Sequence, residues 1–178
     1  LFIFLPIVLG IFYFLIKTGH KQLAVWHLGV ASLIFYSIEN YKFLPVLLIS
    51  ISVNFIIGHF ICSIKARSKI FLILGICINL GLLLYFKYTN FFLSEFFGKD
   101  ISSIILPIGI SFYTFTQIAF LADCYKHETK HYSVSEYVCF VTFFPHLIAG
   151  PILIHRHFIP QLREDSFGRP NYTRIYAA

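Results

Sequence analysis

The sequence predicts an all-α protein, a polytopic bundle of transmembrane helices, and three observations support this fold class. The 178 residues are 58% hydrophobic and only 12% charged, with a mean hydropathy of +0.79. Soluble domains carry about 25% charged residues, so this chain has about half the charge that a water-facing surface requires. Long apolar runs recur, and short polar connections separate them. We therefore predict one membrane domain over residues 1–178.

Six apolar runs approach the roughly 20 residues that a helix needs to cross the hydrocarbon layer. The predicted segments are Leu1–Ile16, Leu23–Ile38, Phe43–Ile64, Ile70–Phe86, Ile101–Ala122 and Val134–Ile154. The first lacks the charged start and cleavage site of a secretory signal, which favours a true membrane helix. The first, second and fourth are short, which favours snorkelling Lys and Tyr side chains or a locally thin bilayer. Short connections predict mostly antiparallel neighbours.

The distribution of Lys and Arg predicts the orientation of the bundle. The connections after the first, third and fifth segments are the more basic ones, with Lys17, Lys21, Lys65, Arg67, Lys69, Lys126 and Lys130. The positive-inside rule makes these connections cytoplasmic and places the N-terminus outside. The net charge of +6 therefore reflects topology, and the absence of a basic patch argues against nucleic-acid binding.

The fifth segment is too polar for a helix surrounded by lipid. On a helical wheel its hydroxyl and amide side chains cover more than half of the circumference: Ser111, Tyr113, Thr114, Thr116 and Gln117. We expect this helix to lie inside the bundle, where an interhelical hydrogen bond contributes about 0.6 kcal/mol.

The sixth segment contains the stretch FFPHLIAGPILIH, in which Pro145 and Pro151 flank Gly150. A proline inside a helix costs about 3 kcal/mol, and broken backbone at membrane depth survives only where protein or a cavity satisfies it. A break would also let the segment return to the cytoplasmic side, which keeps the arginine-rich tail after Arg156 inside. We predict a broken or re-entrant segment. A plain structural kink is the alternative.

The blocks LPIGISFYTFTQIAFLADCYK and FVTFFPHLIAGPILIHRHFIPQL together resemble the membrane-bound O-acyltransferase family, in the branch of alginate O-acetyltransferases. NLGLLLYFKYTNFF and SLIFYS resemble that branch too, so the likeness covers essentially the whole chain. The resemblance implies a bacterial, multi-pass inner-membrane protein whose helices form part of a ring around a tunnel. It implies an acetyltransferase that moves an acyl group from acetyl-CoA or another acyl thioester to hydroxyls of an exported, alginate-like polysaccharide or to a partner acyltransferase protein.

The resemblance also implies the residues that line the tunnel. These are Ser111, Thr114, Gln117, Pro145, His146, Gly150 and Pro151. No catalytic residue is assigned within the chain, because the family's catalytic histidine block has no counterpart here, and we expect it beyond Ala178. Alone, the 178 residues are expected to be inactive. Catalysis by His146 is the lesser alternative to a hydrogen-bonding role.

Other polar residues suggest no separate site. His27 and His59 lie in apolar runs and are interpreted as neutral histidines satisfied by a neighbouring helix. Cys62, Cys77, Cys124 and Cys139 lack metal-binding or disulfide spacing and are interpreted as small buried hydrophobes. No metal or bound cofactor is expected. A transporter or channel with a broken, cavity-lining helix is the alternative function.

Overall fold

The computed structural model describes residues 3–97, 105–126, 132–143, 158–159 and 162–163. Six α-helices form this part of the chain, and it contains no strand, as predicted for an all-α protein. They are α1 (Phe4–Lys17), α2 (Lys21–Asn40), α3 (Leu44–Ser63), α4 (Ser68–Phe97), α5 (Ile110–Tyr125) and α6 (Val134–Thr142). Short 3₁₀ turns, Tyr41–Phe43 and Lys65–Arg67, connect α2 to α3 and α3 to α4.

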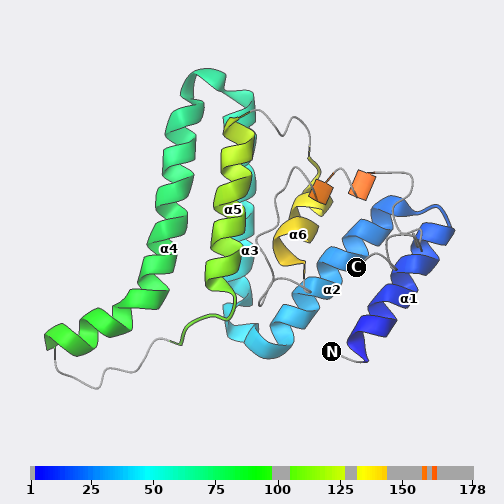
Figure 1. Ribbon diagram of the computed structural model, residues 1–178, viewed down its shortest axis with the longest axis horizontal. Helices are drawn as coiled ribbons and strands as arrows, with labels where there is room; N and C mark the ends of the chain where they lie inside the picture. Colours follow the sequence, from blue (N-terminus) through cyan, green and yellow to red (C-terminus); the bar gives the residue numbers. More distant parts are fainter. Residues whose placement is uncertain (1–2, 98–104, 127–131, 144–157, 160–161, 164–178) are drawn as a thin grey trace, which may run out of the picture.

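The helices pack as two groups, the first made of α3, α4 and α5 and the second of α1, α2 and α6 (Figure 1); α2 and α6 contact the first group. Helix α5 lies against α3 and α4, while α2 lies between α1 and α6. Two glycines permit the close approach in the first group. A Cβ at Gly58 of α3 would lie 2.6 Å from the Phe120 ring and 2.8 Å from the Tyr132 hydroxyl, and one at Gly75 of α4 would overlap Leu121. Small residues let membrane helices pack closely in this way.

Among the described residues, two helical stretches are long and apolar enough to cross a membrane. They are Tyr41–Ser63, with a hydropathy of 2.1, and Lys65–Thr89, with a hydropathy of 2.2. These correspond to the predicted third and fourth segments. Helix α1 is a shorter apolar helix, and α6, with 9 residues, is too short to cross the bilayer by itself.

The fourth segment was predicted too short. Helix α4 continues to Phe97 rather than ending at Phe86. The prediction ended at Phe86 because the apolar run stops there, but a change of polarity does not end a helix, and no Pro or Gly follows before Phe97. Figure 1 shows the end of α4 turning away from the other helices.

The fifth segment was predicted to start too early, because α5 begins only at Ile110. Gly109 precedes it with φ +77°, a left-handed conformation in which glycine avoids the strain that a side chain would bring. Pro107 lies just upstream and accepts a hydrogen bond from the amide of Ile110 through its carbonyl. A Pro and a left-handed Gly thus set the start of the helix, although hydropathy is high throughout.

Helix α6 ends at Thr142, and Phe143 has the non-helical angles φ −50° and ψ 103°. The sixth predicted segment is therefore not helical at Phe143, two residues before Pro145. Residues 144–154, with the prolines and Gly150, lie outside the described residues, so the re-entrant course stays a prediction.

Candidate functional site

A hydrogen-bonded cluster of polar side chains links α3, α4 and α5 in the core. Its members are Ser50 and Asn54 of α3, Asn79 of α4 and Gln117 of α5, each at most 7% exposed. The Gln117 side-chain oxygen accepts from Ser50 Oγ at 2.7 Å and from Asn54 Nδ2 at 2.8 Å. Asn54 and Asn79 exchange amide hydrogen bonds of 3.2 and 2.6 Å. This polar cluster joins three helices by directional contacts.

The polar cluster lies near half-depth of the membrane-spanning stretch. Asn54 is nine residues before the end of α3, and Asn79 is eleven residues after the start of α4. At 1.5 Å per residue both lie about 15 Å from the α3–α4 turn, which is the middle of a hydrocarbon layer of about 30 Å. Four buried amide and hydroxyl side chains at this depth are costly unless they bond to one another, and polar residues there commonly mark functional regions.

The second feature is an open cavity of about 930 Å³ at the end of the bundle where α3 ends and α2 and α6 begin. Val25, Phe55 and Leu162 supply apolar wall. The polar lining is more varied and comprises Lys21, Gln22, His59, Cys62, Ser63, Tyr132, Ser133, Ser135, Glu136 and Arg163. Ligand cavities commonly measure about 300–1,000 Å³ and combine apolar walls with a few polar groups.

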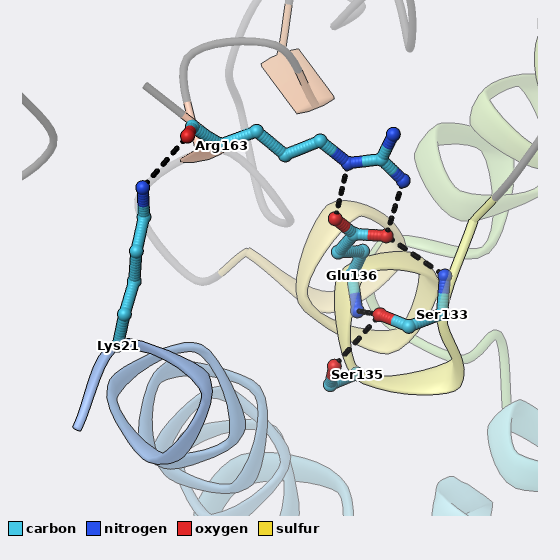
Figure 2. Close-up of polar contacts among 5 residues, drawn as sticks. All are labelled: Lys21, Ser133, Ser135, Glu136 and Arg163. Atoms are coloured by element: carbon cyan, nitrogen blue, oxygen red, sulfur yellow. Dashed lines mark hydrogen bonds and ion pairs between the residues drawn. The ribbon is translucent and has the colours of Figure 1, made fainter. Parts of the chain in front are cut away.

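One wall of the cavity is held by an ion pair that Figure 2 shows. Arg163 donates from Nε to Glu136 Oε1 at 2.6 Å and from Nη2 to Oε2 at 2.9 Å. This two-pronged geometry is the favourable one for Arg and carboxylate. Lys21 Nζ donates to the Arg163 carbonyl oxygen at 2.7 Å. The contacts draw the starts of α2 and α6 and residue 163 into one rim, and the Glu136 carboxylate raises the pKa of Arg163.

The start of α6 explains why Glu136 faces Arg163. Ser133 is the N-cap: its Oγ accepts from the Glu136 amide at 3.2 Å, and its own amide donates to Glu136 Oε2 at 2.8 Å. This capping box satisfies two backbone donors that the helix itself leaves unpaired. Because the Glu136 carboxylate is fixed against its own helix, it presents a preset acceptor to the guanidinium.

An aromatic cluster forms the floor behind the cavity. The ring centroid of Tyr137 on α6 lies 5.5 Å from that of Phe55 on α3 and 4.4 Å from that of Phe120 on α5, and Tyr132 packs edge-on to Phe55 and Phe120. Contacts of this kind contribute about 0.5–1.5 kcal/mol each beyond burial. The cavity is therefore backed by a packed junction of three helices.

Three of the seven predicted tunnel-lining residues are among the residues that the structure describes. Thr114 and Gln117 are fully buried, and Ser111 is partly buried. Gln117 Nε2 and Thr114 Oγ1 have no hydrogen-bond partner within the described residues. Pro145, His146, Gly150 and Pro151 lie outside them. The expectation that the fifth segment lies inside the bundle is matched by the burial of its polar face.

The expected contact of His27 with a neighbouring helix is confirmed, whereas the interpretations of His59 and of two cysteines need correction. His27 does bond to a neighbouring helix, through the Val8 carbonyl at 3.1 Å. His59, however, is exposed, and its ring nitrogen lies 3.5 Å from Ser63 on its own helix, facing the cavity. Of the four cysteines, Cys124 and Cys139 are buried as predicted, whereas Cys77 is exposed and Cys62 is partly exposed. Apolar flanking sequence does not distinguish a core position from one that faces lipid or a cavity.

Sequence reasoning missed Asn54, Asn79 and the Glu136–Arg163 pair. Both asparagines lie near the centres of otherwise apolar runs, which is a readable signal. The Ser133-x-x-Glu136 spacing of a capping box is also readable. Among the described residues, no group of three or more His, Cys, Asp or Glu side chains could hold a metal ion.

Comparison with known proteins gives a consistent result. The chain is 36% identical to a peptidoglycan O-acetyltransferase of Helicobacter pylori over 98% of its length and 40% of the relative's. It is 37% identical to a probable alginate O-acetylase of Pseudomonas aeruginosa over 90% of its length and 33% of the relative's. A probable alginate O-acetylase of Azotobacter vinelandii is 36% identical, with coverage of 90% and 34%. The chain thus spans about a third to two fifths of these relatives.

No protein-family model matches the chain. No solved structure matches it either.

Proposed function

Since the chain is homologous to O-acetyltransferases of the membrane-bound O-acyltransferase family, we propose that its protein transfers acetyl groups to hydroxyls of an exported polysaccharide. The observation that carries this proposal is the identity of 36–37% over 90–98% of the chain to relatives named for that reaction. Their names give peptidoglycan and alginate as acceptors, so the shared class is an exported polysaccharide, and an alginate-like polymer is the narrower proposal. The transporter alternative has no relative in its favour.

The cavity fits the acyl donor, for which acetyl-CoA is the proposed form. Lys21 at the rim provides positive charge for phosphate groups, since its partner is a neutral carbonyl oxygen, whereas the charge of Arg163 is balanced by Glu136; Arg and Lys are the residues that bind phosphate best. The apolar wall of Val25, Phe55 and Leu162 suits the thioester arm. The basic connections after α1 and α3 lie at the same end of the bundle, which the positive-inside rule makes cytoplasmic, where acyl thioesters are made.

The polar cluster at half-depth suits the path between donor and acceptor. Gln117 and Thr114 carry buried polar atoms without a partner among the described residues, and such atoms favour a bound polar group over lipid. The proposed tunnel wall comprises Ser111, Thr114 and Gln117 of α5 together with the sequence FFPHLIAGP, in which Pro145, His146, Gly150 and Pro151 lie. The protein would lie in the bacterial inner membrane and act with an exported polymer or a partner acyltransferase protein.

The donor proposal is tested on the full-length protein in vesicles, by measuring transfer from acetyl-CoA at varied concentration. Lys21→Met should raise KM about tenfold, the equivalent of 1.4 kcal/mol of lost phosphate attraction, and leave kcat nearly unchanged. Lys69→Met is the matched control, because Lys69 is an exposed lysine at the same end of the bundle that does not line the cavity. An equal KM in both variants would exclude donor binding at this cavity.

The tunnel-wall proposal is tested in cells by labelling the extracellular polymer with radioactive acetate. Pro151→Leu should reduce labelling while the protein remains in the membrane, because a continuous helix would close the path. Unchanged labelling would remove Pro151 from the wall and leave the donor cavity unaffected.

A further inference from the structure

One group in the cavity has a chemistry that donor binding does not use, namely the thiol of Cys62. Cys62 is partly exposed and lines the cavity from the last turn of α3. The thiol of Cys124 on α5 lies close enough to form a hydrogen bond with it. Tyr132, which also lines the cavity, interacts with Cys124 in turn. Cys62 therefore belongs to a polar group at the floor of an open space, unlike Cys77, which lies on the outer surface of α4.

A base is available one helical turn away. His59 precedes Cys62 by three residues on α3, and residues three apart occupy the same face of a helix. Both residues line the same cavity, and His59 is exposed within it. A cysteine becomes a nucleophile when an adjacent histidine accepts its proton, so the cavity contains both parts of such a pair.

We propose that Cys62 accepts the acyl group of the thioester donor, with His59 as the base. His59 takes the proton from the Cys62 thiol, and the sulfur attacks the carbonyl carbon of the donor. The carbon–sulfur bond of the donor breaks, a new thioester forms on Cys62, and His59 returns the proton to the departing thiol. One thioester replaces another, so the exchange needs no oxidant, reductant or further reactant. The inference rests on the proposed function, because it takes the donor to be an acyl thioester.

The test exposes the full-length protein in vesicles to acetyl-CoA that is radiolabelled in the acetyl group, and reads protein label and polymer label separately. We expect protein label that neutral hydroxylamine releases, as it releases thioesters. Cys62→Ala should lower this label at least about tenfold. His59→Gln should slow its appearance about 100-fold, the lower end of the range for a lost acid–base group. Cys77→Ala should leave it unchanged. Mass spectrometry of the wild-type peptide should place the acetyl group on Cys62 and does not depend on any variant folding.

Labelled polymer together with unlabelled protein, or with label retained by Cys62→Ala, overturns the inference and leaves the proposed function intact. An acetyl group found on another cysteine also overturns it. If neither polymer nor protein is labelled, the proposed function and the inference both fail.

Discussion

Replacing Asn54 with Leu should destabilise the bundle through the polar cluster. The substitution removes three interhelical hydrogen bonds, one to Gln117 and two with Asn79. At about 0.6 kcal/mol each they contribute about 2 kcal/mol. The Asn79 oxygen also loses its donor while it remains 1% exposed, which adds about 1 kcal/mol or more. We expect a total loss of about 3 kcal/mol in the free energy of unfolding.

Thermal unfolding of the full-length protein in detergent measures this loss. A loss of 1 kcal/mol lowers Tm by about 2–4 °C in a chain of about 150–250 residues and by less in a longer one, so a loss of about 3 kcal/mol should lower the Tm of the full-length protein by about 3–5 °C. Ser52→Leu is the matched control, since Ser52 is exposed on the same helix and bonds only to the Leu48 carbonyl of its own helix. It should change Tm by no more than about 2 °C.

The double variant Asn54→Leu with Asn79→Leu separates pairing from packing. If the two amides act as a pair, the double variant should cost at least about 1 kcal/mol less than the sum of the two single variants. Additive losses, or an Asn54→Leu variant as stable as Ser52→Leu, would show that the polar cluster does not hold the three helices together.

Three further predictions address packing, the ion pair and orientation. Gly58→Val should destabilise the protein by about 1–3 kcal/mol, because its Cβ would meet the Phe120 ring. Gly81→Val on α4 is the control, since nothing lies within 4 Å of a Cβ there. In the same unfolding assay it should cost less than about 1 kcal/mol. Glu136→Gln should lower stability by about 1 kcal/mol at low salt, and the difference from wild type should shrink in 1 M salt as the charges are screened; a loss independent of salt would contradict an electrostatic contribution. In a cysteine-free background, Ala66→Cys should react with a membrane-impermeant maleimide only after the cytoplasmic face is opened, and Tyr41→Cys should react in intact cells; the reverse pattern would invert the orientation.

Much of the fold could be predicted from the sequence, because hydropathy and turn residues determine where the helices lie. The first four helices follow from apolar runs separated by short polar connections, and in the described part of the chain α3 and α4 are long and apolar enough to cross a membrane. Boundaries failed where local backbone chemistry differs from hydropathy. Gly109 delays the start of α5, and Lys87 does not end α4.

The sequence likewise predicted some residues of the candidate site and missed others. Gln117 was predictable as an interior residue, because an amide in an apolar helix needs a partner. Its partners Ser50 and Asn54 were not, since wheel position does not identify which neighbouring helix it meets. The Glu136–Arg163 pair joins residues 27 positions apart, and such a contact depends on the path of the chain between them. The prediction that a neighbouring helix satisfies His59 was wrong, because one side of α3 borders a cavity that no sequence pattern indicates.

The equal depth of Asn54 and Asn79 has a consequence for biogenesis. Each of these helices alone would bring an amide oxygen without a donor into the lipid as it leaves the translocon, because only the amide nitrogens bond to carbonyls of their own helix. Because the asparagines lie at matching distances on either side of the turn at residues 64–67, the two helices can enter the bilayer together as a hairpin with the amides already paired. The turn that joins them is thus short enough to make insertion of the third and fourth helices a single event, before the fifth helix is synthesised.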